Sequence, residues 1–113
     1  WHFMKARHRL DKVWQNIPDD TDIIITHTPP KGILDLSYNR QHDLEFCGCS
    51  ALRKRIEQIK PKLSLFGHIH KNKDKVNSGI RKLSIIDTIF SNGSLVTDGK
   101  FGKLSSNGNI LII

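Results

Sequence analysis

Short apolar runs that stop abruptly at polar residues predict the main elements of this chain. Ile23–Ile25 and Leu63–Phe66 are apolar at nearly every position, which is typical of strands in a parallel sheet. Between them, Ser50–Ile59 has a helix-like pattern. The order strand, helix, strand predicts a β-α-β unit whose two strands are parallel. Because Ile23–Ile25 has no polar position, we expect it in the centre of the sheet, covered on both faces.

The same patterns predict the flanking elements. Residues 5–16 place apolar side chains, Trp14 among them, at helical spacing, which indicates an amphipathic helix. Residues 31–46 show little periodicity and are expected to form a long loop above the sheet edge. Residues 83–90 predict a further strand, and residues 110–113 predict a short last one. A turn is expected at residues 78–79.

Histidines follow both strands of the predicted β-α-β unit. His27 comes after Ile23–Ile25, and His68 and His70 come after Leu63–Phe66. Neighbouring parallel strands lie roughly 4.8 Å apart and end at the same edge of the sheet, where ligands bind. We therefore expect the three imidazoles to converge on one metal ion or on a pair, as in a site that cleaves phosphoesters. The alternative at each position is a histidine held by backbone hydrogen bonds alone.

Two sequence blocks resemble those of calcineurin-like metallophosphoesterases. Thr26-His27-Thr28-Pro29-Pro30 is similar to the family's Thr-His-x-Pro-Pro block, and Gly67-His68-Ile69-His70 is similar to its Gly-His-x-His block. The chain most resembles the branch of metallophosphoesterase-domain proteins related to class III cyclic-nucleotide phosphodiesterases, whose Asn-Ala-Ser is similar to Asn92-Gly93-Ser94. The resemblance implies an α/β fold in which residues 1–113 form the C-terminal part of a calcineurin-like phosphoesterase domain. That domain is a sandwich of two mixed β-sheets flanked by helices.

The resemblance also implies what the chain lacks. The family's Asp-x-His, Gly-Asp and Gly-Asn-His-Asp/Glu blocks lie upstream of Thr-His-x-Pro-Pro, and none occurs here. The family scheme implies two divalent metal ions, of manganese, iron or zinc, with His27 and His68 holding one ion and His70 the other. The bridging aspartate and the general-acid histidine belong to the absent blocks, so no catalytic residue is assigned in this chain. We expect an incomplete piece of the enzyme, inactive alone, whose partner is the missing N-terminal half of the domain.

Candidate substrate contacts lie outside the two histidine blocks. Arg40 and His42 belong to the loop expected above the sheet edge, and Asn92 follows the third predicted strand. Plain solvent exposure is the alternative for Arg40 and His42. The expected substrates are phosphomonoesters or phosphodiesters, as phosphorylated small molecules or nucleotides.

Charge and cysteine usage narrow the class of protein. The chain has 18 Lys and Arg against 11 Asp and Glu, a formal charge of +7, scattered in the manner of a solvated face. No apolar run approaches the roughly 18 residues of a membrane span, so no membrane partner is expected. Cys47 and Cys49 are too close for an ordinary structural disulfide, which favours a reducing, cytoplasmic location.

Three alternatives remain beside the enzyme. His42, Cys47 and Cys49 form a candidate zinc site, although a fourth ligand is not evident. The second alternative is a nucleotide-binding module that keeps the fold but has lost catalysis. The third alternative is a protein that binds nucleic acid through its net positive charge.

Overall fold

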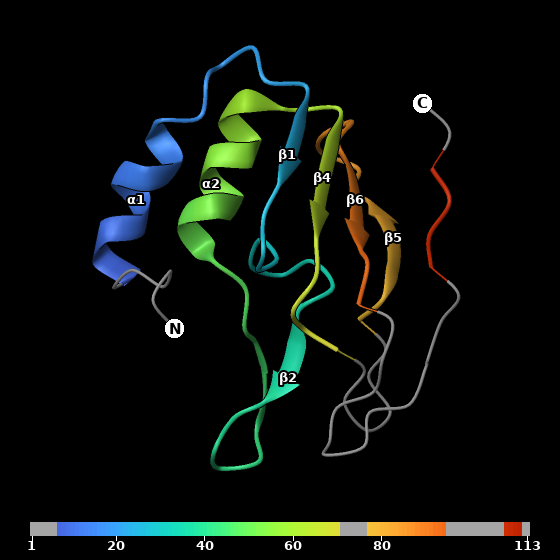
Figure 1. Cartoon of the computed structure of the whole chain (residues 1–113). Coiled ribbons are helices and arrows are strands. Elements are labelled where there is room, and N and C mark those ends of the chain that lie inside the picture. Colours follow the sequence, from blue (N-terminus) through green and yellow to red (C-terminus); the bar gives the residue numbers. More distant parts are fainter. Residues whose placement is uncertain (1–6, 71–76, 95–107, 112–113) are drawn as a thin grey trace.

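The computed structural model describes residues 7–70, 77–94 and 108–111, which adopt an α/β fold (Figure 1). A four-stranded sheet has the strand order β1-β4-β6-β5, and β2 and β3 form a separate two-stranded sheet. No helix within these ranges is both long and apolar enough to cross a membrane. The elements in chain order are α1 (Arg7–Gln15), β1 (Ile23–Ile25), β2 (Leu36–Tyr38), β3 (Leu44–Phe46), α2 (Ser50–Ile59), β4 (Leu63–Phe66), β5 (Gly79–Lys82) and β6 (Ile89–Asn92).

The predicted β-α-β unit is confirmed. β1 pairs in parallel with β4, with Ile23 opposite Leu63 and Ile25 opposite Leu65, and α2 connects the two strands. β4 also pairs in parallel with β6, and β6 pairs antiparallel with β5. The carboxyl ends of β1, β4 and β6 therefore lie at one edge of the sheet.

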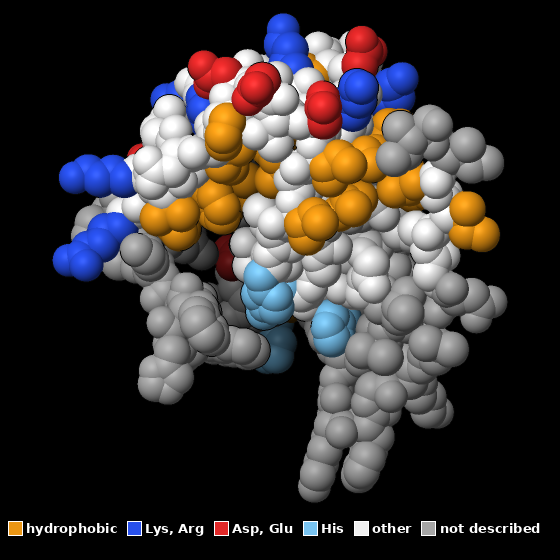
Figure 2. Space-filling view, turned by 45° about the horizontal axis from the view of Figure 1, so that its top comes forward, with side chains coloured by type: hydrophobic (Ala, Val, Ile, Leu, Met, Phe, Trp, Pro, Cys, Tyr) orange, Lys and Arg blue, Asp and Glu red, His pale blue; other side chains and the backbone are white. Residues whose placement is uncertain are grey.

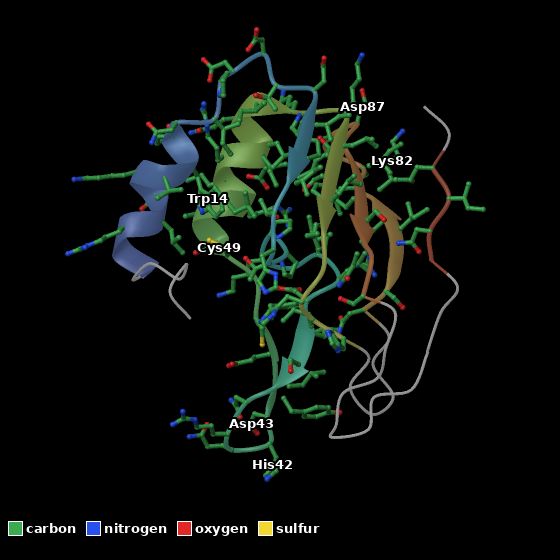
Figure 3. The ribbon with its side chains drawn as sticks, viewed as in Figure 1. Trp14, His42, Asp43, Cys49, Lys82 and Asp87 are labelled. Atoms are coloured by element: carbon green, nitrogen blue, oxygen red, sulfur yellow. The ribbon has the colours of Figure 1, made fainter. Side chains whose placement is uncertain are left out.

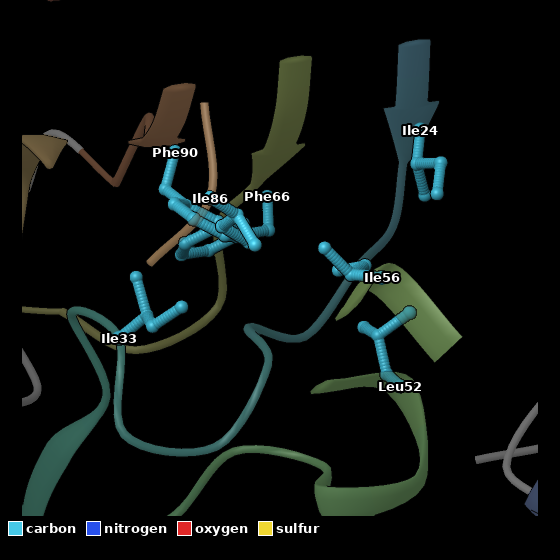
Figure 4. Close-up of a cluster of buried hydrophobic side chains, with 7 residues drawn as sticks. All are labelled: Ile24, Ile33, Leu52, Ile56, Phe66, Ile86 and Phe90. Atoms are coloured by element: carbon cyan, nitrogen blue, oxygen red, sulfur yellow. The ribbon is translucent and has the colours of Figure 1, made fainter. Parts of the chain in front are cut away.

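The hydrophobic core lies between the helices and one face of the sheet. Ile24 of β1, Phe66 of β4 and Phe90 of β6 belong to the same buried cluster as Leu52 and Ile56 of α2 (Figure 4). Within the described residues, the helix predicted over residues 5–16 is confirmed as α1 (Arg7–Gln15), which packs beside α2 (Figure 1). Burial of each such apolar side chain contributes about 1.5–3 kcal/mol to folding, and this cluster holds the sheet edge in place.

The expectation that Ile23–Ile25 occupies the centre of the sheet is wrong. β1 is an edge strand, and the exposed fractions of Ile23, Ile24 and Ile25 are 47%, 5% and 76%. The helices cover one face only, so Ile24 is buried while its neighbours point the other way. Ile80 of β5 lies in the same row of the sheet as Ile25 and is also exposed. Figure 2 shows hydrophobic side chains gathered on one face of the molecule. We call Ile23, Ile25 and Ile80 the open face.

Residues 31–46 do not form the expected long loop. They contain β2 and β3, which pair antiparallel with Leu36 opposite Phe46 and Tyr38 opposite Leu44. The Asn39 side chain organises the turn, because its Oδ1 atom accepts hydrogen bonds from the backbone N–H groups of residues 41 and 43 at 2.9 and 3.0 Å. The hairpin extends away from the helices and the main sheet (Figure 3). Each strand has only three residues, too few for a clear alternating pattern.

The strand predicted over residues 83–90 is shifted. β6 covers Ile89–Asn92, and residues 83–88 form no strand. β5 begins at Gly79, where a turn was expected, and its residues 80–82 are exposed at the second edge of the sheet. Residues 108–111 form no strand, and residues 112–113 lie outside the described ranges. Apolar runs alone did not separate the buried strand from the bend before it.

Arg55 of α2 connects this helix to the end of α1 and to the segment that follows α1. Its buried guanidinium donates hydrogen bonds to the backbone carbonyls of Trp14, at 3.2 Å, and Ile17. We expect Arg55→Met to lower the free energy of unfolding by about 1–3 kcal/mol, because two half-buried carbonyls lose their donor. Urea denaturation measures the change. The control is Arg53→Met on the same helix, whose side chain is more exposed and pairs with Glu57. This control should cost less than about 1 kcal/mol, and equal losses would contradict the anchoring role.

Candidate functional site

His27 is positioned by backbone pairing that continues beyond the ends of β1 and β4. The Thr26 N–H donates to the carbonyl of Leu65 at 3.0 Å, and the Gly67 N–H donates to the carbonyl of His27 at 3.2 Å. These bonds extend the parallel ladder by two residues past β1. They place His27 directly beside the Gly67-His68 segment.

The side chains of His27 and His68 come together at this edge. Their ring centroids are 4.6 Å apart, with the ring planes tilted by 51°. Both side chains are exposed, and Figure 2 shows histidine side chains below the apolar surface. The expectation that His27 and His68 lie together at the carboxyl ends of neighbouring parallel strands is confirmed. Two adjacent, solvent-accessible imidazoles fit part of the ligand set of a divalent transition-metal ion.

The turn after His27 is locked to the start of α2. The buried Pro29 accepts a hydrogen bond from the Cys49 N–H at 2.9 Å, and the Lys31 N–H donates to the Cys49 carbonyl at 3.1 Å. A Cβ atom at Gly48 would lie 2.7 Å from backbone atoms of Pro30 and Lys31, so only glycine allows this close approach. The backbone that carries His27 is therefore fixed on both sides.

Asp35 contributes to the same support and was not singled out from the sequence. It is fully buried, and its Oδ2 atom accepts hydrogen bonds from the N–H groups of Gly32, at 2.9 Å, and Gly48, at 2.8 Å. The Asp35 carbonyl also accepts from the Cys47 N–H at 2.9 Å. This carboxylate joins the segment after the prolines to the entry of α2. A single aspartate between Leu34 and Leu36 has no periodicity that could have revealed this role.

His68 has a backbone conformation that is unusual for a residue other than glycine. Its φ angle is +68°, and the Ile69 N–H donates to the Gly67 carbonyl at 2.8 Å, which closes a tight turn around His68. Left-handed conformations of this kind cost on the order of 1–3 kcal/mol and occur where surrounding structure enforces them. The turn directs the chain away from β4 immediately after the sheet edge.

His70 does not complete a three-ligand cluster with the other two imidazoles. Among residues 7–70, 77–94 and 108–111, no group of three or more His, Cys, Asp and Glu side chains is arranged to hold a metal ion. The expected convergence of all three histidines is therefore reduced to the pair His27 and His68 in the described structure. The complete ligand set of a metal site is not present in these residues.

The alternative zinc site of His42, Cys47 and Cys49 is not formed in the described residues either. Cys49 has a different place, because its Sγ atom accepts hydrogen bonds from the Trp14 indole N–H at 3.4 Å and from the Leu52 N–H at 3.5 Å. Cys49 thus caps α2 and ties it to α1, and Figure 3 shows Trp14 and Cys49 facing each other. His42 lies at the tip of the hairpin.

The three candidate substrate contacts lie in two different environments. Arg40 and His42 are exposed in the turn between β2 and β3 (Figure 3). Asn92 is fully buried at the end of β6, and its amide bonds to backbone groups inside the protein. The place of Asn92 differs from the one expected of a substrate contact, because its side chain has no exposed surface. Its hydrogen bonds to backbone groups indicate a structural role.

Several known proteins are similar in sequence to this chain. No family model matches the chain. It is 39% identical over 77 residues to one UPF0046 protein of Caenorhabditis elegans and 35% identical over 103 residues to another, matches that cover 68% and 84% of this chain. It is 38% identical over 72 residues, or 62% of this chain, to human metallophosphoesterase domain-containing protein 1.

The chain spans only part of these relatives. It covers 25% and 34% of the two nematode proteins and 21% of the human protein. An α/β chain with paired histidines at the carboxyl edge of its parallel strands thus matches proteins named for a metallophosphoesterase domain. Over the matched residues, the chain is similar to metallophosphoesterase domain-containing protein 1 of human and mouse.

Proposed function

We propose that this chain forms part of a metal-dependent phosphoesterase that hydrolyses phosphomonoesters or phosphodiesters, nucleotides among them. The observation that carries the proposal is the pair of His27 and His68, 4.6 Å apart beyond the ends of β1 and β4. The carboxyl edge of parallel strands is the usual place for ligands in α/β folds. The relation to metallophosphoesterase-domain proteins supports the same chemistry.

In this proposal, the histidines provide part of the ligand set for two divalent ions. His27 and His68 hold one ion, and His70 contributes to the second. Imidazole and carboxylate ligands together suit manganese, iron or zinc better than magnesium. Such ions supply Lewis acidity to a phosphoryl oxygen. The chain's own contribution is to hold the imidazoles in a fixed orientation, and its net charge of +7 attracts phosphorylated substrates toward the protein.

The remaining ligands come from the part of the relatives that this chain does not span. The open face of Ile23, Ile25 and Ile80 is the surface against which that N-terminal part packs in our proposal. An edge strand also leaves backbone groups for pairing with another strand. Both features support a domain that is completed by further chain.

A non-catalytic nucleotide- or nucleic-acid-binding module is the second candidate. It is favoured by the net charge of +7 and by the lack of a three-ligand group in the described ranges. This candidate uses the same fold but requires no metal. Binding of nucleic acid by such a module should weaken steeply as salt is raised.

The deciding experiment restores the upstream part of the domain, by fusion or as a separate chain, using the sequence that precedes this segment in the full protein. We expect hydrolysis of a chromogenic phosphodiester or phosphomonoester with Mn²⁺, Zn²⁺ or Fe²⁺, and none after chelation of the metal. A completed protein that binds nucleotide but hydrolyses neither substrate with any of these ions would favour the binding module.

The isolated chain should bind divalent metal weakly. His27 and His68 provide two neutral ligands, whereas most transition-metal sites in proteins use three or four protein ligands. Calorimetric titration with Zn²⁺ should give weak binding, with an affinity that falls further in His27→Ala. Asp43→Asn, which changes a carboxylate at the hairpin tip, serves as the control and should leave the titration unchanged. Tight binding of two equivalents by the isolated chain would contradict this division of the ligand set.

A further inference from the structure

The side chain of Asn92 forms a hydrogen bond to the backbone of the turn that carries His68. Asn92 lies opposite Phe66 at the end of β6, and its Nδ2 atom donates hydrogen bonds to the carbonyls of Ile69, at 3.1 Å, and Leu34, at 3.0 Å. The Asn92 Oδ1 atom accepts from the Ser94 N–H at 2.9 Å. Every polar atom of this buried amide is therefore bonded to backbone.

Asn77 bonds to the next carbonyl, that of His70. We call residues 67–70 the histidine turn. Its Nδ2 atom donates to the carbonyls of His70, at 2.9 Å, and Leu36, at 2.7 Å, while its Oδ1 atom accepts from the Leu36 N–H at 3.0 Å. Asn77 is also buried. Two asparagines thus make the same connection side by side, each joining a carbonyl of the histidine turn to a carbonyl in the segment that follows the two prolines.

The hydrogen bonds of Asn77 and Asn92 join the two segments that carry the paired histidines. The turn after β4 carries His68, and the segment after Pro30 continues the chain that carries His27. An asparagine amide suits this junction because one NH₂ group donates to two carbonyls at once, which no hydrophobic side chain of that size can do. The φ angle of His68 is unfavourable, and the asparagine bonds add to the Ile69 N–H bond that closes the turn from within.

We propose that Asn77 and Asn92 are positioning residues that hold the His68 turn against His27 and so set the spacing of the two imidazoles. This role rests on the proposed function in so far as the imidazoles hold a metal ion. It assigns to Asn92 a function different from substrate contact, and it gives Asn77 a function that its sequence context did not indicate. Neither side chain touches the metal or the substrate.

The test uses NMR spectroscopy of the full chain without metal, followed by titration with Zn²⁺. Ring protons of His27 and His68 should show a cross-relaxation peak, as the 4.6 Å separation requires. Asn92→Leu and Asn77→Leu should each weaken or abolish this peak, while methyl signals of the core isoleucines keep their native positions. Affinity for Zn²⁺ should fall by about tenfold or more, which is the usual effect of removing an outer support of a metal ligand.

Asn109→Leu is the matched control. Asn109 is a partly buried asparagine whose Nδ2 atom donates to the carbonyls of Gly79 and Asn92 and to the Ser91 hydroxyl, and none of these partners belongs to the histidine turn. It should keep both the cross peak and the Zn²⁺ affinity. A cross peak that survives in the Asn92 and Asn77 variants, or that disappears equally in the control, would overturn the positioning role.

The wild-type chain provides a measurement that does not depend on the variants folding. The side-chain NH₂ protons of Asn77 and Asn92 should exchange slowly with solvent, whereas those of the exposed Asn16 exchange fast. Fast exchange at the two buried amides would contradict the proposal. A chain that shows the cross peak and its loss in the variants, but no response to Zn²⁺, would refute the metal site and leave the positioning of the imidazoles intact.

Discussion

His68→Ala should nearly abolish metal-dependent hydrolysis by the completed protein. His68 lies beside His27 at the carboxyl edge of the sheet, where we propose that the two rings hold one ion. Removal of an outer partner of a metal ligand costs about 10- to 100-fold, so loss of the ligand itself should cost at least about 100-fold. His70→Ala should have an effect of similar size, because it removes the contribution to the second ion. Steady-state rates measured over a range of Mn²⁺ concentrations test both variants.

Two further variants separate loss of metal from loss of structure. His42→Ala removes an imidazole from the hairpin tip, so any effect should fall on KM, and the Mn²⁺ concentration that gives half the maximal rate should stay the same. Trp14→Phe removes the indole hydrogen bond to Cys49 and should mainly lower stability. If His68→Ala or His70→Ala leaves the rate unchanged, the catalytic role proposed for these histidines is wrong. If His42→Ala alone reduces the metal response, the site lies at the hairpin instead.

The sequence contained enough information to predict how His27 and His68 meet. Two apolar strands separated by a helical segment are normally parallel, because the helix crosses back over the sheet. The carboxyl ends of two adjacent parallel strands lie at the same edge. The observed register, with Ile25 opposite Leu65, then places the residues after each strand side by side. This part of the site depends on local patterns and on a single topological rule, both of which can be read without coordinates.

The position of β1 within the sheet was not predictable in the same way. Three consecutive isoleucines suit a strand buried on both faces, but they equally suit an edge strand whose outer face awaits another part of the protein. The pattern reports how apolar a segment is, and it does not report whether the covering layer is present. The exposure of Ile25 is therefore consistent with the chain spanning 25% and 34% of the two nematode relatives.

The polar framework beneath the site was also beyond sequence analysis. Asp35, Asn77 and Asn92 act through hydrogen bonds to residues that are distant in the chain, for example the 41 positions that separate Asn77 from Leu36. Such bonds leave no periodic signal, and each residue type is common in surface turns. The similarity of Asn92-Gly93-Ser94 to a family motif indicates the place of Asn92 in the sequence but not its buried environment.

Phe90→Ala should have the largest effect on the stability of the isolated chain. Phe90 is fully buried on β6 and packs in the cluster that contains Ile33, Phe66 and Ile86 (Figure 4). Replacement of a buried phenylalanine by alanine costs about 3–5 kcal/mol, because transfer energy is lost and a cavity remains. Domains are stable by only about 5–15 kcal/mol in total, so this loss should remove a large fraction of the free energy of unfolding. Urea denaturation followed by tryptophan fluorescence measures the loss.

Phe46→Ala provides the matched control for this substitution. Phe46 is 52% exposed on β3, so the same change of side chain removes little buried surface and should alter stability by about 0.5 kcal/mol or less. The difference between the two variants measures how strongly the core between α2 and the sheet supports the edge that carries His27 and His68. Equal losses for Phe46→Ala and Phe90→Ala would show that β6 is not packed as described. The positions of Asn92 and of the histidine turn above it would then lose their physical basis, because both depend on β6 lying beside β4.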